Sequence, residues 1–201
     1  MEDFDTQSAR ESGASRGFAI ATFAGGCFWC AQADFCKVEG VLKVTSGYTG
    51  GDTENPSYEE VCSGRTGHVE AVQLVFDPRR VKYERLLEYF WEHVDPTDPG
   101  GQFVDRGPQY RSAIFYHNEE HREAAEASKR MLIDSGRLKK PVVTRILPFS
   151  KFYEAEGYHQ DYNEKNPTHY NHYRFFSGRD QFLAKLWGKV DEVDGGGKAK
   201  E

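Results

Sequence analysis

Two adjacent glycines constrain this chain more than any other local feature. The segment before them, residues 18–24 (FAIATFA), is an apolar run rich in strand-forming residues, and the segment after them, residues 27–37, has a helical pattern. Gly25 and Gly26 let the backbone turn tightly between the two. The sequence therefore predicts a strand-to-helix turn that delivers Cys27 to the first turn of a helix.

Strands and helices alternate along the rest of the chain. Strands are predicted at 41–46, 68–76, 110–116 and 142–147, and helices at 81–94, at 152–162 and after Asn118, which can cap a helix. The loop between the strands at 41–46 and 68–76 is long, and irregular structure follows 152–162. The order βαββαβαβ favours an α+β fold, a two-layer sandwich of the split βαβ (ferredoxin-like) type with a mainly antiparallel mixed sheet and an irregular C-terminal segment.

The length of 201 residues suits one domain with a sizeable core. Residues 1–16 and 191–201 are rich in Gly and charge and have no periodicity, so we expect a disordered N-terminal extension and a disordered C-terminal tail. A single domain is therefore predicted over residues 17–190.

Charge and hydropathy exclude several classes of partner. The chain has 26 Lys and Arg against 32 Asp and Glu, a net charge of −6, which gives no electrostatic footprint for nucleic acid or an anionic membrane surface. No run approaches the ~18 apolar residues that span a bilayer. The N-terminus has no apolar region of a signal peptide, although it could be what remains after processing. We expect a soluble, cytoplasmic protein that binds neither nucleic acid nor membrane.

Cysteine usage indicates reactivity. Cys27, Cys30, Cys36 and Cys62 are too few for a disulfide scaffold at this length, and three of them fall within ten residues. At the start of a helix, unpaired N–H groups and the helix dipole would favour a thiolate at Cys27. The alternative is a buried, inert cysteine, but the glycines and flanking aromatic residues favour the reactive one.

The other cysteines differ in their distance from Cys27. Cys30 lies three residues on, where helical Cβ atoms are roughly 5–6 Å apart, so it could resolve an oxidised Cys27. Cys36 lies roughly 13 Å along an intact helix and is interpreted as structural. A zinc site is disfavoured because the chain has one C-x-x-C and no second pair, and because His169 and His172 lie among Asn and Tyr residues.

Glu70 is the second candidate for chemistry. In the strand at 68–76 the period of two places Glu70 on the face of Val72, Leu74 and Phe76. Desolvation there would raise the pKa of its carboxyl group and make it a proton donor near neutral pH. The alternative is a solvated position at the frayed end of the strand, beside Gly67.

Six segments, in order, resemble the A-type peptide methionine sulfoxide reductases. They are GGCFWC at 25–30, SGYTGG at 46–51, NPSYEEVCSGRTGHVEAV at 55–72, FWEHVDPTD at 90–98, DRGPQYRSAIFY at 105–116 and FYEAEGYHQDY at 152–162. The resemblance spans roughly residues 18–188 and is strongest for the subgroup with the GCFWC motif, which lacks recycling cysteines in a C-terminal tail.

The resemblance implies a mechanism in which Cys27 attacks the sulfur of the S epimer of methionine sulfoxide, releases methionine and becomes a sulfenic acid. Glu70 matches the acidic residue that protonates the sulfoxide oxygen, Tyr58 and Tyr110 match tyrosines that hydrogen-bond that oxygen, and Asp105 matches a carboxylate that holds water. This division suits the chemistry, because a sulfoxide is a poor electrophile until its oxygen carries a proton.

The resemblance also implies an aromatic cage around the terminal methyl group of the substrate, formed by Phe28 and Trp29. Without the resemblance, Phe28 and Trp29 would be interpreted as core residues, and Tyr58 and Tyr110 as residues that pack in strands or loops. His68 lies in a matched segment but receives no chemical step, since a histidine on the apolar side of a strand is more often a hydrogen-bonded core group.

The sulfenic acid must then be reduced. We predict attack by Cys30 to give a 27–30 disulfide, which thioredoxin, or dithiothreitol in vitro, reopens; Cys62 and then Cys36 are the alternatives. No bound cofactor or metal is expected, and the enzyme would repair oxidised proteins, peptides and free methionine sulfoxide as a monomer. Gln32 and Cys36 depart from the family, since many members have acidic residues there.

Two rival functions remain. A general dithiol–disulfide oxidoreductase would share a C-x-x-C at a helix start, although there the flanking residues differ and the domain is shorter. A binding module could use the aromatic cage and the tyrosine-rich loops to hold a methylated or peptide ligand, with Cys27 incidental.

Overall fold

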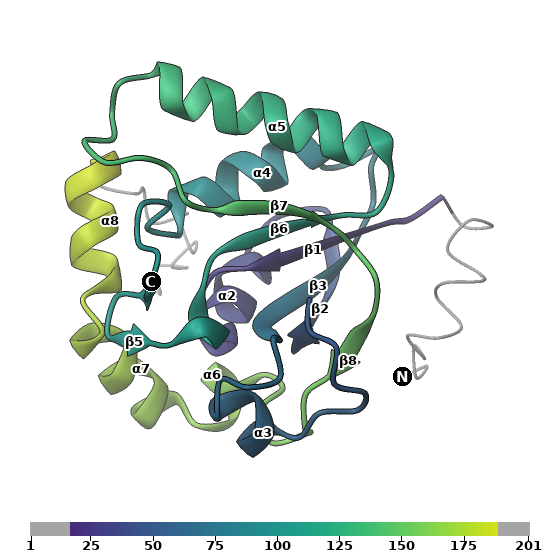
Figure 1. The fold of residues 1–201 in the computed structure, drawn as a ribbon, viewed down its shortest axis with the longest axis vertical. Helices are drawn as coiled ribbons and strands as arrows, with labels where there is room; N and C mark the ends of the chain where they lie inside the picture. Colours follow the sequence, from purple (N-terminus) through teal and green to yellow (C-terminus); the bar gives the residue numbers. More distant parts are fainter. Residues whose placement is uncertain (1–16, 189–201) are drawn as a thin grey trace, which may run out of the picture.

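The computed structural model describes residues 17–188, so the tails predicted at 1–16 and 191–201 lie outside the described residues. Six strands form the main sheet in the order β7-β6-β1-β3-β2-β8 (Figure 1). Strand β7 pairs with β6 in parallel, and the other neighbours pair antiparallel. The strands are β1 (Ala19–Ala24), β2 (Val41–Thr49), β3 (Val69–Phe76), β6 (Ala113–Tyr116), β7 (Arg145–Pro148) and β8 (Phe152–Glu154).

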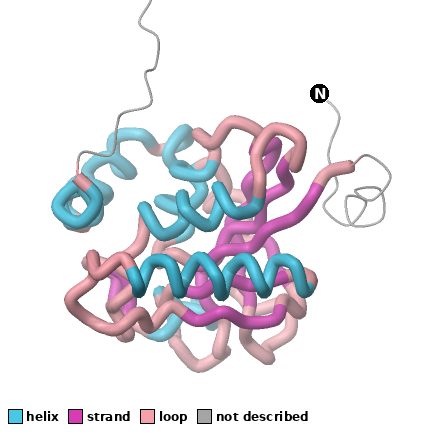
Figure 2. Tube along the Cα trace, turned by 90° about the horizontal axis from the view of Figure 1, so that it is seen from above, coloured by secondary structure: helices cyan, strands magenta, loops and turns pink. Residues whose placement is uncertain are grey.

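Helices α2 (Phe28–Phe35), α4 (Tyr83–Glu92) and α5 (Glu119–Asp134) supply the helical half of the core. Figure 2 shows these helices and the strands from above. The predicted α+β class is confirmed, and each strand and helix named above except β8 overlaps an element of the same type expected from the sequence. Asn118 caps α5 as predicted, because its side chain accepts a hydrogen bond from the backbone N–H of His121 at 2.8 Å.

Aromatic packing fixes α2 against the sheet. Phe23 on β1 stacks on Phe35 of α2, with ring centroids 5.2 Å apart, and on Phe90 of α4 at 5.3 Å. All three rings are buried, and burying such a side chain contributes roughly 1.5–3 kcal/mol. The aromatic contacts therefore fix the C-terminal end of α2, and the turn before the helix fixes its N-terminal end.

Two predictions of local structure are incomplete, and one small element was not predicted. The predicted long loop contains α3 (Tyr58–Cys62), which a capping box between Ser57 and Glu60 starts. The strand predicted at 110–116 begins only at β6, because Tyr110 ends a 3₁₀ turn, η1 (Pro108–Tyr110). A small hairpin of β4 (Gly101–Gln102) and β5 (Asp105–Arg106) precedes that turn.

The C-terminal prediction is wrong. Instead of a helix over 152–162, β8 pairs with Gly47–Thr49 of β2 and a turn follows. The backbone approaches closely there: a Cβ at Gly47 would lie 2.3 Å from the carbonyl oxygen of Tyr153. The expected irregular segment is helical, with α6 (Tyr162–Lys165), α7 (Pro167–Phe176) and α8 (Arg179–Trp187).

Among the residues that the structure describes, no helix combines the length and the apolar character needed to cross a membrane.

Candidate active site

The turn between β1 and α2 has the predicted geometry. Gly26 has φ +83°, and a Cβ there would lie 2.5 Å from Cβ of Gln102, so both the backbone conformation and the space require glycine. Cys27 follows as the N-cap residue of α2 and is 6% exposed. The predicted strand-to-helix turn and the position of Cys27 at the helix start are confirmed.

Glu70 lies against this turn. The backbone N–H of Phe28 donates a 2.9 Å hydrogen bond to Glu70 Oε2, and the residue is 2% exposed. Burial raises the pKa of the Glu70 carboxyl group to about 8, although the bond from Phe28 acts in the opposite direction. The predicted desolvation is confirmed, and the carboxyl group is mostly protonated at neutral pH. Because Oε2 accepts the Phe28 N–H, Oε1 is the oxygen left to carry the proton.

The thiols of Cys27 and Cys30 are hydrogen-bonded to each other. Burial, the bond to Cys30 and the nearby carboxylates raise the pKa of the Cys27 thiol well above its ordinary value, whereas accepting that bond lowers the pKa of Cys30. The expectation of a resting thiolate at Cys27 is therefore wrong. The physical reason is that burial disfavours the charged thiolate, and the side chain of Cys27 accepts no capping hydrogen bond from the helix that would offset this effect.

Tyr58 and Tyr110 surround the same carboxyl group. Burial raises the pKa of both hydroxyl groups, and Glu70 in its ionised form raises these pKa values further, so both remain O–H donors. Tyr58 begins α3, and its backbone N–H donates to Glu156 Oε1 at 2.9 Å. Its hydroxyl group is hydrogen-bonded to the thiol of Cys62, which is intermediate in burial. Cys62, an alternative resolving cysteine, therefore lies beside Tyr58.

Asp105 on β5 completes the polar part of the site. Burial raises the pKa of its carboxyl group, while a 2.5 Å hydrogen bond donated by the hydroxyl group of Tyr173 opposes this effect. Asp105 also raises the pKa of both Glu70 and Cys27 by its charge. Five of the residues singled out from the sequence therefore share one electrostatic environment: Cys27, Glu70, Tyr58, Tyr110 and Asp105.

The two aromatic residues after Cys27 have different surroundings. Phe28 is 1% exposed and packs in the core, with its ring centroid 5.8 Å from that of Tyr48 and 5.0 Å from that of His159. Trp29 is half-buried and stacks on Tyr162 with centroids 3.8 Å apart. Its indole N–H donates to His159 Nδ1 at 3.1 Å. Trp29 is therefore the more accessible of the two rings.

Sequence reasoning assigned no roles to His159, Glu156 or Tyr48, which build one wall of the site. Glu156 accepts hydrogen bonds from the hydroxyl group of Tyr48 at 2.8 Å and from the N–H of Tyr58. The ring of His159 lies 4.4 Å from that of Tyr58, and its Nε2 is buried without a hydrogen-bond partner. His159 and Glu156 lie in the matched segment 152–162, where a carboxylate and a histidine among aromatic residues were the available signal.

The remaining candidates lie farther from the chemistry. Cys36 is the C-cap residue of α2 and is exposed as a residue. Its thiol is nevertheless partly desolvated, and this effect together with nearby Asp161 and Glu164 raises its pKa to about 11. His68 is 3% exposed, accepts the N–H of Gly51 at Nδ1, and places Nε2 2.7 Å from the carbonyl oxygen of Thr53. The expectation that His68 is a hydrogen-bonded core group is confirmed.

Gln32 connects α2 to two other segments. Its side-chain amide is 1% exposed; Nε2 donates to the carbonyl oxygen of Val44 at 3.0 Å, and Oε1 accepts the N–H of Asp161 at 2.8 Å. An amide fills this position because it supplies both a donor and an acceptor. The departure from an acidic residue therefore serves the packing of the segment that contains His159.

Within residues 17–188, no group of three or more His, Cys, Asp or Glu side chains is arranged to hold a metal ion.

Comparison with known proteins finds consistent similarity. The family described as "Peptide methionine sulfoxide reductase" matches residues 19–191. The chain is 61% identical over 169 residues to a peptide methionine sulfoxide reductase MsrA of Bacillus subtilis, covering 84% of this chain and 96% of the relative. It is 57% identical over 167 residues to an MsrA of Listeria monocytogenes, covering 83% and 94%.

Solved structures agree with this similarity. Reduced Mxr1 from Saccharomyces cerevisiae superposes with a TM-score of 0.72 at 30% identity, covering 76% of this chain and 88% of that one. Methionine sulfoxide reductase A of Corynebacterium diphtheriae superposes with a TM-score of 0.68 at 36% identity, covering 75% and 76%.

Proposed function

Because the chain belongs to the peptide methionine sulfoxide reductase family, it is a thiol-dependent oxidoreductase that reduces methionine sulfoxide, and we propose that Cys27 and Glu70 carry out the chemical step. The observation that supports this most directly is the hydrogen bond from Phe28 N–H to Glu70. This bond holds a buried, protonated carboxyl group beside the nucleophile Cys27, which directly precedes Phe28.

In the first half of the reaction, Glu70 gives its proton to the oxygen of the S epimer of methionine sulfoxide. The sulfur of Cys27 attacks the sulfur of the activated sulfoxide, and the substrate leaves as methionine. The oxygen ends on Cys27 as a sulfenic acid, so the substrate sulfur is reduced and the sulfur of Cys27 is oxidised. The raised pKa of the Cys27 thiol means that its proton leaves only as the attack proceeds, and this proton returns to the Glu70 carboxylate, which gave its own to the oxygen.

The surrounding residues orient the substrate. Tyr58 and Tyr110 donate hydrogen bonds to the sulfoxide oxygen, which their raised pKa values favour. Asp105 holds a water molecule, and Phe28 with Trp29 forms the cage around the terminal methyl group. Trp29 would contact the methyl group through its exposed part, while buried Phe28 forms the floor.

In the second half, Cys30 attacks the sulfenic acid and forms the 27–30 disulfide. The hydrogen bond between the two thiols supports Cys30 over Cys62, which is bonded to Tyr58, and over Cys36 at the far end of α2. The assignment of Cys30 as the resolving cysteine goes together with membership of this chain in the GCFWC subgroup. A C-x-x-C disulfide suits reduction by a dithiol, thioredoxin in the cell and dithiothreitol in vitro, without a prosthetic group.

The wider assignments follow from the same proposal. The chain acts on oxidised proteins, peptides and free methionine sulfoxide, as a monomeric, cytoplasmic, single catalytic domain over 17–190 that binds neither nucleic acid nor membrane. The strand order β6-β1-β3-β2 supports the split βαβ (ferredoxin-like) description with a mainly antiparallel mixed sheet.

A thiol count by intact mass tests both halves. Wild type and Cys30→Ser are mixed with one equivalent of methionine S-sulfoxide without reductant. We expect wild type to lose two thiols, and Cys30→Ser to release methionine and retain a sulfenic acid. A disulfide in the variant would assign the second half to Cys62 or Cys36. If wild type releases no methionine, the proposed chemistry fails, and a dithiol oxidoreductase or a binding module takes its place.

A further inference from the structure

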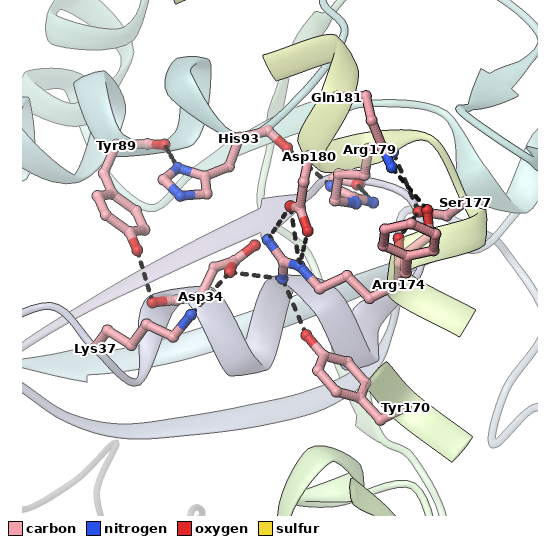
Figure 3. Close-up of polar contacts among 12 residues, drawn as sticks. Asp34, Lys37, Tyr89, His93, Tyr170, Arg174, Ser177, Arg179, Asp180 and Gln181 are labelled. Carbon is pink, nitrogen blue, oxygen red and sulfur yellow. Dashed lines mark hydrogen bonds and ion pairs between the residues drawn. The ribbon is translucent and has the colours of Figure 1, made fainter. Parts of the chain in front are cut away.

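Two arginines of the C-terminal helices reach the region of the thiols, half-buried Arg174 at α2 and buried Arg179 at the turn before it. Arg174 on α7 lies between two carboxylates: Nη1 donates to Asp34 Oδ1 at 2.7 Å, and Nη2 to Asp180 Oδ1 at 2.8 Å (Figure 3). It also donates to the hydroxyl group of Tyr170 at 2.9 Å. The charge of Arg174 is therefore balanced by partners of its own.

Arg179 on α8 is in a different situation. It is 1% exposed, and its guanidinium donates to two carbonyl oxygens, that of Gly25 at 3.0 Å and that of His93 at 2.8 Å. The group lies over the ring of Phe103, 4.4 Å from the centroid, and its Nε has no hydrogen-bond partner. Within the described part of the chain, no carboxylate forms an ion pair with Arg179, although Asp180 is the next residue.

An unpaired buried cation is costly, because carbonyl oxygens satisfy its N–H groups but do not neutralise its charge. Such a charge is stabilised when an anion forms nearby. Arg179 lies at the turn that delivers the nucleophile: a Cβ on Gly26 would be 3.2 Å from its Nη2. Its charge acts on the thiol of Cys30 and on Asp105.

We propose that Arg179 is a positioning residue for the second half of the reaction, in which its charge stabilises Cys30 as the thiolate that attacks the Cys27 sulfenic acid. This inference rests on the proposed function, and specifically on Cys30 as the resolving cysteine. The S–S bond forms as the S–O bond of the sulfenic acid breaks, and the departing oxygen takes up a proton and leaves as water. Cys30 is oxidised and Cys27 is reduced to the disulfide level, so no external oxidant is needed.

The environment of Cys30 includes groups of both signs. Burial and the carboxylate of Asp34 raise the pKa of Cys30, whereas Arg179 and Arg174 lower it. The charged and titratable groups that act on or interact with it are Cys27 and Asp34 on α2, Glu70 on β3, Tyr170, Tyr173 and Arg174 on α7, and Arg179 on α8. Of the two arginines that act on Cys30, Arg174 is paired with carboxylates and Arg179 is not, so removal of Arg179 should have the larger effect.

The test is a titration of the Cys30 thiolate by its ultraviolet absorbance. Cys27→Ala removes the hydrogen bond between the thiols, which by itself raises the pKa of Cys30, and leaves Cys30 to be followed below the titration of the other two cysteines. Cys36, with a pKa of about 11, and Cys62, with a raised pKa, contribute little there. Adding Arg179→Met should move the midpoint up by on the order of one pH unit. Arg179→Lys, which keeps the charge, should restore most of the shift.

Arg137→Met is the matched control. Arg137 also donates to a carbonyl oxygen, that of Leu186 at 3.1 Å, and lies 4.8 Å from the ring centroid of Trp187, but it is exposed. Its removal should leave the midpoint unchanged. The proposal is overturned if Arg179→Met leaves the midpoint in place, or if Arg179→Lys or Arg137→Met moves it as far. If Arg179→Met does not fold, Arg179→Gln replaces it, since glutamine is neutral and can still donate to Gly25.

A kinetic measurement connects the titration to function. In single turnovers without reductant, Arg179→Met should form the 27–30 disulfide about tenfold more slowly at neutral pH relative to its own methionine release. An unchanged ratio contradicts the inference. Failure of the proposed function looks different: wild type would release no methionine, or Cys30→Ser would still form a disulfide, whatever the titration gives.

Discussion

The carboxyl group of Glu70 caps the helix that the nucleophile begins, since Oε2 accepts the backbone N–H of Phe28 at 2.9 Å. A capping position ordinarily stabilises a carboxylate, because it lies at the positive end of the helix dipole. Here burial outweighs that effect and raises the pKa of Glu70 to about 8. The contact therefore orients the carboxyl group, and burial keeps it protonated, which is what an acid needs.

The first prediction concerns the pH dependence of methionine release. Protonated Glu70 is the active form, so the single-turnover rate should be high below pH 8 and fall as pH rises through the pKa of about 8. In Glu70→Gln the rate should be lower by about 10²–10⁴-fold, and the decline near that pH should disappear. Glu59→Gln, which changes an exposed carboxylate on α3, should keep the wild-type profile. A decline that persists in Glu70→Gln would contradict the assignment.

The second prediction concerns stability. A carboxyl group with a pKa of about 8 in the folded protein and an ordinary pKa of 4.5 when unfolded binds more protons in the folded state between those values. The free energy of unfolding should therefore decrease as pH rises through this window. Glutamine keeps an acceptor for the Phe28 N–H without the titration, so Glu70→Gln should be the more stable protein at pH 8.

Urea unfolding at pH 5 and pH 8 measures this difference. The stability gained by Glu70→Gln at pH 8 relative to pH 5 should be on the order of 3 kcal/mol. Equal pH dependence in the two proteins would show that Glu70 is not the group with the raised pKa. If Glu70→Gln is more stable but less active than wild type, the buried carboxyl group of Glu70 lowers the stability of the folded protein while serving catalysis.

The third prediction concerns the hydrogen bond from the indole of Trp29 to His159, 3.1 Å long. Such a bond contributes about 0.5–1.5 kcal/mol, so His159→Ala should raise KM for methionine sulfoxide by about 2–10-fold through a less fixed Trp29. In a Trp29→Phe background the indole N–H is absent, and His159→Ala should then change KM much less. Steady-state kinetics on the four proteins gives the coupling. Additive effects would contradict a role for His159 through Trp29.

Local sequence patterns predicted much of this site, but they did not predict the features that depend on contacts between distant segments of the chain. Two glycines and an apolar run were enough to predict the turn at Cys27, and a period of two was enough to bury Glu70, because both depend on neighbours in sequence. The pKa shifts of the thiols were not predictable in this way. The shift of Cys27 depends on its burial near carboxylates, and that of Cys30 depends on Cys27 and on Arg179, which is 154 residues from Gly25 in sequence.

The C-terminal half shows the same limit. Aromatic spacing at 152–162 suggested a helix, but β8 forms because β2 offers it a sheet edge, a long-range contact that overrides local preference. His159 and Glu156 reach the site only through that arrangement. The resemblance to the reductase family supplied roles for Tyr58, Tyr110 and Asp105 that residue types alone would not have given.

The last prediction concerns Gln32, which lies where many family members have an acidic residue. Its amide donates to Val44 O at 3.0 Å and accepts the N–H of Asp161 at 2.8 Å, and the residue is 1% exposed. Gln32→Glu would keep the acceptor but lose the donor, leaving a buried carbonyl group unpaired and placing a carboxyl group in the interior.

In Gln32→Glu, the free energy of unfolding should fall by about 2–4 kcal/mol at neutral pH, and less in acid, where the carboxyl group is protonated and can donate. Gln32→Met, which loses both hydrogen bonds without adding a charge, should be destabilised without this pH dependence. Urea unfolding of both variants at two pH values separates the outcomes: equal losses at both pH values in Gln32→Glu would mean that this chain accommodates the acidic residue by another arrangement.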